Sequence, residues 1–495
     1  MHRSVLVLTL SIFLGCSGGK DDDGSASTPA DTDTDTDTDT DADTDTDTDA
    51  DADTDTDTDS DTDTDLPAGY AFSSRDGTSD SVSYGGQIFR HVLIHDVGVY
   101  LDGLTDDLVG GRIAAPGDVA VDLDFYLLFD SGVGGSLPHG VSPVAGAAVQ
   151  GTYDDISSGK NLVEKIAGND PVGQHRDWAT SFRGFSGPPQ TPEATIRGWI
   201  AEIDAAAVDW SNGTYPRDPS GNIVGSVYVT SDGRDLKQLV LKTLRGAIAF
   251  SQAADDYLDD DEPGKGLLAD HSAQEDGEPY TALEHAWDEG YGYFGASRDY
   301  LSWSLADRSD GSYDTDDDGG IDLLTEVAWH SSVNAAKRDA GSTTATTYGD
   351  EAWQALYDGR ALIASWDDTP GSSQRDELAA YRDVALDRWE KAIGATMVHY
   401  VNDTVADMDA IGTKAYSFDD HAKHWSELKA FALFPQFNPH SVMSDADFDT
   451  LHGLLGDAPV IEGTKELAAY RADLLAARDL LETVYGFDSA DTAAW

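Results

Sequence analysis

Residues 374–402 read QRDELAAYRDVALDRWEKAIGATMVHYVN, and their apolar positions recur at helical spacing. If this stretch is a helix, one face carries a stripe of apolar side chains, formed by Leu386, Trp389, Ile393, Met397 and Tyr400. Such a stripe is typical of a helix that buries one face against its neighbours. The stretch therefore predicts a long amphipathic helix and favours a mainly helical fold.

Four further segments show the same periodicity. Thr191 and Pro192 form a helix start, with Thr as N-cap and Pro at the first helical position. In three of the segments, the residues at helical spacing are Phe89, Val92, Leu93, Val97, Tyr100 and Leu101; Ile196, Trp199, Ile200 and Ile203; and Leu236, Val240, Leu244, Ala247 and Ser251. The fourth segment runs from Glu466 to Val484. The periodicity predicts helices in all four segments.

Gly- and Pro-rich stretches separate the helices, notably at 102–160, 211–234 and 262–280. Val119 to Phe129 alternates between apolar and polar residues, which predicts a short strand. The expected fold class is thus mainly α, bundle-like, with long loops and a short β element. Residues 67–495 are enough for one large domain or two subdomains.

The first residues show an export pattern. Met1-His2-Arg3 precedes an apolar run from Val5 to Leu14, which is shorter than the roughly 20 residues that span a bilayer. Phe13-Leu14-Gly15-Cys16 resembles a bacterial lipobox, and Cys16 is the only cysteine in the chain. We expect a signal peptide at 1–15, lipidation of Cys16 and, because Ser17 follows the cysteine, an outer-membrane location.

Residues 31–65 carry Asp at every odd position, mostly alternating with Thr. Like charges repel and no apolar groups offset the ordering entropy, so residues 16–66 are predicted to be a lipidated cysteine followed by a disordered linker. The alternative, a calcium-binding repeat, lacks a glycine in the repeat to turn the chain around an ion.

The acidity extends beyond this linker. The whole chain has a formal net charge of −62, and about −43 of that belongs to residues 67–495. Nucleic acid, itself a polyanion, is therefore disfavoured as a partner, and we expect no nucleic-acid binding, whereas cations are attracted. No protein partner is indicated.

The sequence Glu284-His285-Ala286-Trp287-Asp288-Glu289-Gly290-Tyr291-Gly292-Tyr293-Phe294-Gly295 resembles a family of bacterial lipoproteins grouped as domain of unknown function 4856. The resemblance covers nearly all of 68–487, and its other segments are Ser83 to Gln87, Asn334 to Asp339, His424 to Phe431 and Phe437 to Pro439. It implies an envelope location and a mainly helical fold. His285 is also similar to the motif histidine of imelysin-like proteins, but Asp288 stands where that motif has Glu.

One acidic segment has the spacing of a calcium loop. Asp314, Asp316 and Asp318 occupy positions 1, 3 and 5, Gly319 occupies position 6 and Asp322 occupies position 9. Hard oxygen ligands must converge around a sharp turn to bind Ca²⁺. Thr325 stands at position 12 and Glu326 one place later, so we predict a calcium site of Asp314, Asp316, Asp318, Asp322 and Glu326, with an acidic turn as the alternative.

A second metal site is suggested by helical pairs. His285, Asp288 and Glu289 share one predicted helical face, as do His424 and Glu427. If these helices faced each other, the groups would suit iron or zinc. His399 and Asp403 form a weaker pair of the same kind. The alternative is a packed core in which these polar groups are hydrogen-bonded.

The segment with Asn334, Lys337, Arg338 and Asp339 is basic in an acidic chain, which predicts ion pairs with neighbours or a clamp for a ligand carboxylate.

No hydrolase elbow, zinc-protease motif, phosphate loop or cysteine nucleophile occurs in residues 67–495. The leading hypothesis is an envelope-anchored, non-enzymatic binding protein with structural calcium that serves metal uptake. The alternatives are a metal-dependent hydrolase that uses the His285 region and a surface adhesion or scaffold module.

Overall fold

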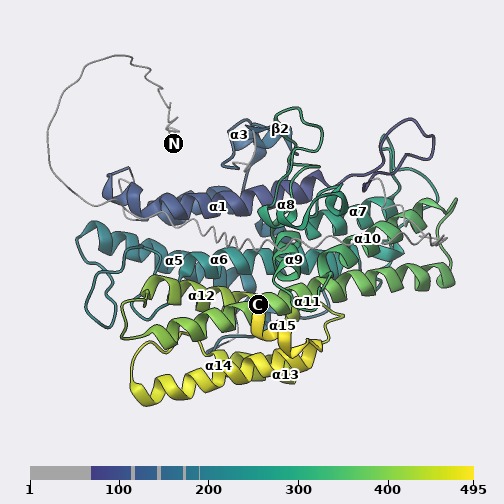
Figure 1. The fold of residues 1–495 in the computed structure, drawn as a ribbon. Helices are drawn as coiled ribbons and strands as arrows, with labels where there is room; N and C mark the ends of the chain where they lie inside the picture. Colours follow the sequence, from purple (N-terminus) through teal and green to yellow (C-terminus); the bar gives the residue numbers. More distant parts are fainter. Residues whose placement is uncertain (1–68, 113–116, 142–146, 171–173, 189) are drawn as a thin grey trace, which may run out of the picture. The chain divides into compact units, whose positions relative to one another are not determined.

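The long helix predicted at 374–402 forms the middle of α11, which runs from Ser372–Ala410 in a computed structural model of the chain (Figure 1). Leu386, Trp389, Ile393 and Met397 are buried along it, while Tyr400 is partly exposed. Four helices pack along α11: α9 (His330–Ala340), α10 (Tyr348–Ala364), α12 (Phe418–Phe431) and α14 (Thr464–Tyr485). This helix is therefore the element around which much of the core is arranged.

The structure describes residues 69–495 except 113–116, 142–146, 171–173 and 189. Within this part of the chain the fold is mainly α, as predicted. The other α-helices are α1 (Gly85–Val109), α2 (Asp118–Leu127), α3 (Ser131–Gly134), α4 (Trp178–Ser181), α5 (Pro192–Ser211), α6 (Leu236–Leu244), α7 (Ala282–Phe294), α8 (Leu305–Asp310), α9 (His330–Ala340), α10 (Tyr348–Ala364), α12 (Phe418–Phe431), α13 (Asp445–Leu455), α14 (Thr464–Tyr485) and α15 (Ser489–Ala494). Short 3₁₀ turns are η1 (Tyr153–Asp155), η2 (Val163–Lys165), η5 (Gly266–Leu268), η6 (Tyr300–Ser302) and η7 (Phe434–Phe437).

The helix start predicted at Thr191 and Pro192 is confirmed. Thr191 caps α5, because its hydroxyl accepts a hydrogen bond from the Ala194 N–H, and Pro192 occupies the first helical position. The predicted helices at 236–251 and 466–484 also form. The first continues beyond α6 into two π-helical segments, η3 (Arg245–Phe250) and η4 (Ala253–Tyr257), a geometry that recurs at functional positions.

The strand predicted at Val119 to Phe129 is wrong, because this segment is α2. Val119, Leu123 and Leu127 are buried at helical spacing, whereas Val121 is 67% exposed. The alternating pattern also contains this i, i+4 set, and packing of α2 against α1 and α5 selects the helix.

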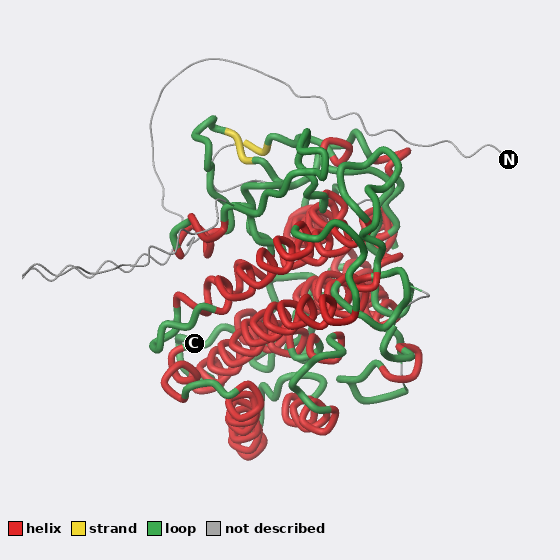
Figure 2. Tube along the Cα trace, turned by 90° about the vertical axis from the view of Figure 1, so that its right-hand side faces the viewer, coloured by secondary structure: helices red, strands yellow, loops and turns green. Residues whose placement is uncertain are grey.

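The sheet of the described region consists of two short strands from distant parts of the sequence. β1 (Ala147–Ala148) pairs in parallel with β2 (Gly320–Ile321), with Ala147 opposite Gly320. In Figure 2 these strands lie among loops at the top of the view, and the long helices lie below them. β2 belongs to the predicted calcium loop, so the sheet fixes that loop against the segment that contains β1.

The export signal, Cys16 and the Asp-Thr linker lie outside the described residues, so their predictions are not addressed by the fold. Among residues that are described, no helix combines the length and apolar character needed to span a membrane.

Candidate metal centre

The acidic loop begins just after α8 and is closed at its base by backbone pairing. Ser312 and Val327 form an isolated antiparallel bridge, and the Tyr313 N–H donates to the Glu326 carbonyl at 3.2 Å. The two ends of the loop are thereby held together. The residues between them must form a compact turn.

The turn depends on left-handed backbone at two positions. Gly319 has φ of +84°, which glycine adopts without steric cost, and Asp317 has φ of +58°. The Gly319 N–H donates to Asp314 Oδ2 at 2.9 Å, and the Asp318 N–H donates to Asp316 Oδ1 at 3.1 Å. The glycine at position 6 thus makes the sharp reversal that its place in the sequence predicted.

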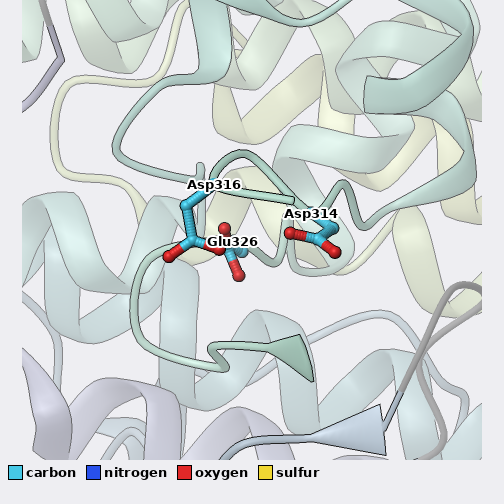
Figure 3. A group of neighbouring side chains, drawn as sticks. All are labelled: Asp314, Asp316 and Glu326. Carbon is cyan, nitrogen blue, oxygen red and sulfur yellow. The ribbon is translucent and has the colours of Figure 1, made fainter. Parts of the chain in front are cut away.

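Three carboxylates converge at this turn. Asp314, Asp316 and Glu326 each offer an oxygen that lies within 4.8 Å of the other two (Figure 3). Glu326 is buried, and its carboxylate accepts hydrogen bonds from the Thr315 N–H at 2.8 Å and the Asp322 N–H at 2.9 Å. These bonds direct the acid at position 13 into the group.

Two predicted ligands lie outside this group. Asp318 Oδ1 accepts from the Gly320 N–H at 2.7 Å. Asp322 Oδ1 accepts from the Leu324 N–H at 2.7 Å and from Gln150 Nε2 at 3.1 Å. Sequence reasoning missed Gln150, because it precedes Asp322 by 172 residues and carries no local signal. Its amide connects the loop to the segment that follows β1.

The electrostatics of the turn favour a cation. The hydrogen bond from the Asp318 N–H lowers the pKa of Asp316, but desolvation and the charges of Asp318, Glu326 and Asp314 outweigh it and raise that pKa. Asp314 Oδ1 is buried and accepts no hydrogen bond from a protein group in the described region. The turn therefore concentrates negative charge and leaves one carboxylate oxygen without a donor.

The His285 group has other partners. The His285 ring stacks on Tyr280 with centroids 4.3 Å apart, and its Nδ1 lies 3.1 Å from the Ser83 carbonyl oxygen. Its Nε2 lies 3.8 Å from Glu289 Oε1, which itself accepts from Gln87 Nε2 at 2.8 Å. The Ser83 to Gln87 segment therefore meets the His285 segment directly.

Asp288 belongs to a buried ion pair. Its Oδ1 accepts from Arg360 Nε at 2.9 Å and from the Tyr70 hydroxyl at 2.9 Å, and its Oδ2 accepts from the Ser83 N–H at 3.2 Å. Burial raises the pKa of Asp288 to about 6, although the Arg360 charge acts in the opposite direction. Both carboxylate oxygens of Asp288 therefore accept hydrogen bonds from groups in the core, and this pairing favours a structural role over that of a metal ligand.

The His424 group likewise has its own partners. His424 Nδ1 lies 2.8 Å from Asp407 Oδ2, and Glu427 Oε1 lies 3.1 Å from Lys242 Nζ. His399 Nε2 lies 3.2 Å from Asp403 Oδ2.

The structure does not assemble the predicted iron or zinc site. Among the described residues, no three ligand atoms of His285, Asp288, Glu289, His424 and Glu427 converge; the group that does converge is Asp314, Asp316 and Glu326. The alternative of hydrogen-bonded core groups describes this second set better, because each of its side chains is paired with a different neighbour.

The basic segment in α9 forms no ion pair of its own in the described part of the chain. Lys337 is exposed, and burial lowers the pKa of Arg338, against the raising effects of Tyr400 and Asp403. Asp339 is buried and accepts from Thr346 Oγ1 and from the Tyr348 and Gly349 N–H groups. It anchors the turn before α10. Among the residues that the structure describes, the ion pairs predicted for this segment are not found.

Together these features define a mainly helical protein with an acidic loop in which three carboxylates converge. Residues 194–382 match the family described as Domain of unknown function (DUF4856), which confirms the family resemblance over this stretch. The matched part includes the His285 segment, the acidic loop and the Asn334 to Asp339 segment. The Ser83 and His424 segments lie outside the matched residues, so their part of the resemblance stays a prediction. The imelysin-like similarity also stays a prediction. Comparison with curated proteins and with solved structures finds no match.

Proposed function

We propose that this protein is an envelope-anchored, non-enzymatic binding protein in which the loop at 314–326 binds a structural calcium ion. The observation that carries the calcium proposal is the convergence of oxygens from Asp314, Asp316 and Glu326 within 4.8 Å of one another.

The donor set favours Ca²⁺ over softer metals. All three side chains offer carboxylate oxygens, and Ca²⁺ takes six to eight oxygen ligands with flexible geometry. Zinc and iron sites usually include imidazole or thiolate, and neither belongs to this group. Backbone carbonyls and water would complete the shell, with Glu326 taking the part that position 12 has in the usual loop.

The position of the loop supports a structural role. It lies between α8 and α9, its base is closed by the bridge between Ser312 and Val327, and Gln150 attaches it to the β1 segment. A cation would offset the repulsion among the carboxylates. It would thereby stabilise the loop, its base between α8 and α9, and its attachment to the β1 segment. Because the ion binds the folded loop, it would stabilise the fold by mass action.

The proposed location supports the same ion. A lipid on Cys16 would tether the chain, and the Asp-Thr linker would hold the folded region away from the membrane surface. Calcium sites of extracellular modules have dissociation constants of about 10⁻⁴ to 10⁻³ M, so a site with three protein carboxylates suits an extracytoplasmic protein. A net charge of −62 also raises the local concentration of cations.

Calorimetry of the purified protein tests the calcium proposal. We expect calcium to raise the melting temperature relative to chelator, and a calcium concentration about 100-fold above Kd would stabilise the fold by about 2.7 kcal/mol. Asp314→Asn combined with Asp316→Asn should abolish the difference.

The matched control is Asp367→Asn combined with Asp368→Asn, which removes the same charge from an exposed turn and should preserve the response to calcium. Equal melting temperatures with millimolar calcium and with chelator would show that the loop is only an acidic turn. An equal response of both double variants would assign the effect to general charge screening.

A further inference from the structure

A cavity of about 750 Å³ opens between α5, α13 and the segment 180–188, which begins at the end of α4. Its volume is in the range of sites that enclose small molecules. Phe182, Phe185 and Trp199 form apolar parts of its wall, and the Phe185 and Trp199 rings meet edge to face with centroids 5.5 Å apart. Nothing in the calcium loop contributes to this cavity.

Behind Phe185 lies a buried amine. Lys429, near the end of α12, has no solvent exposure, and its Nζ lies 4.8 Å from the centroid of the Phe185 ring. In the described region this Nζ has neither a hydrogen-bond partner nor an ion pair. Burial lowers the pKa of Lys429 to about 7, against the opposing charge of Asp457. A buried donor without an acceptor is costly, so the amine is suited to a ligand atom that accepts a hydrogen bond.

The charged groups at the cavity disfavour an anion. Arg183 contacts Asp445 at 2.5 Å and Asp449 at 3.1 Å, and Arg234 contacts Glu202 at 2.9 Å. Both guanidinium groups are thus neutralised by the protein. An anionic ligand would meet the carboxylates of Glu202, Asp449 and Asp457, which line the cavity, and both lining arginines are already paired. A neutral ligand would not be repelled by them.

Phe185 is placed to control access to the amine. It lines the cavity and covers Nζ at the same time. Gly184 and Gly187 flank it with φ of +122° and +116°, conformations that residues with side chains rarely adopt. Glycine restricts the backbone angles less than any other residue. A change of backbone angle at either position would move the Phe185 ring relative to Lys429.

We propose that this cavity binds a small neutral molecule with an apolar ring or chain and a carbonyl oxygen, which accepts a hydrogen bond from Lys429 Nζ after the Phe185 ring turns away. The inference rests on the proposed role as a binding protein and names its ligand class. It does not depend on calcium.

Two probes of nearly equal shape test it: acetophenone, which has a carbonyl, and ethylbenzene, which lacks one. We expect the full protein, titrated by ligand-observed NMR, to bind acetophenone about tenfold more tightly, the value of one net hydrogen bond. Lys429→Met should keep the binding of ethylbenzene but lose the preference. Lys423→Met, an exposed lysine on the same helix, should retain it. Phe185→Ala should strengthen the binding of acetophenone.

The proposal would be overturned if neither acetophenone nor ethylbenzene bound to the wild type. It would also be overturned if the preference for acetophenone survived in Lys429→Met. Tighter binding of benzoate than of acetophenone would overturn the neutral class. Titrations repeated in chelator separate this result from the calcium proposal, because acetophenone should still bind if the loop takes no ion.

Discussion

Replacement of Arg360 by Met tests whether the Asp288 pair holds the core together. Arg360 on α10 is fully buried, and its guanidinium donates to Asp288 at 2.9 Å, Glu284 at 3.1 Å and the Ser81 hydroxyl at 2.8 Å. Methionine fills similar space but removes the charge and all three bonds. Asp288 would then be a buried carboxylate without a countercharge. Breaking such a pair from one side costs about 3–5 kcal/mol of unfolding free energy.

The loss should depend on pH in a defined direction. Asp288 has a folded pKa of about 6, above its ordinary value, so its contribution to stability is full in acid and is lost as pH rises through about 6. At pH 5 the carboxyl is already mostly protonated, and without the Arg360 charge its pKa should rise further, so the uncompensated charge becomes costly only at higher pH. Arg360→Met should therefore be less destabilising at pH 5 than at pH 8.

Urea unfolding followed by tryptophan fluorescence at the two pH values measures both effects. Arg388→Met is the control, since it removes a partly exposed arginine paired with Glu351 and Asp387 and should cost less than about 1 kcal/mol. Adding Asp288→Asn to Arg360→Met should recover part of the loss. A loss from Arg360→Met below about 1 kcal/mol, or one of equal size at pH 5 and pH 8, would refute this account of the core.

Two further predictions concern a second buried carboxyl and the membrane anchor. Burial raises the pKa of Glu390 to about 7 despite hydrogen bonds from Ser441, Asn438 and Tyr485, so stability should fall as pH rises from about 4.5 through 7. Glu390→Gln should remove about 2 to 4 kcal/mol of that pH dependence in urea unfolding, and an unchanged profile would contradict it. Cys16→Ser should move the protein from the membrane fraction to the soluble fraction on cell fractionation, and unchanged membrane association would exclude lipid anchoring at this residue.

Parts of the candidate site could be predicted from sequence because their causes are local. Gly319 makes its turn within the loop, and its N–H reaches Asp314 five residues away. The convergence of Asp314, Asp316 and Glu326 was only partly predictable. The spacing included all three but also Asp318 and Asp322, whose carboxylates accept from nearby backbone N–H groups instead. Which acids face a common point depends on backbone conformation that residue spacing does not specify.

The sequence alone determined several of the helices, because periodicity and capping act over a few residues. The stripe in α11 and the Thr191 cap of α5 are of this kind. Only the tertiary structure decided which side chains meet. It paired Asp288 with Arg360, 72 residues away, and His424 with Asp407 instead of with the His285 group. It also made Val119 to Leu127 a helix, since the face that a segment buries depends on the elements that cover it. Contacts between distant residues depend on how the helices pack. The periodicity of apolar residues shows which face of a segment is buried, but it does not show which other segment covers that face.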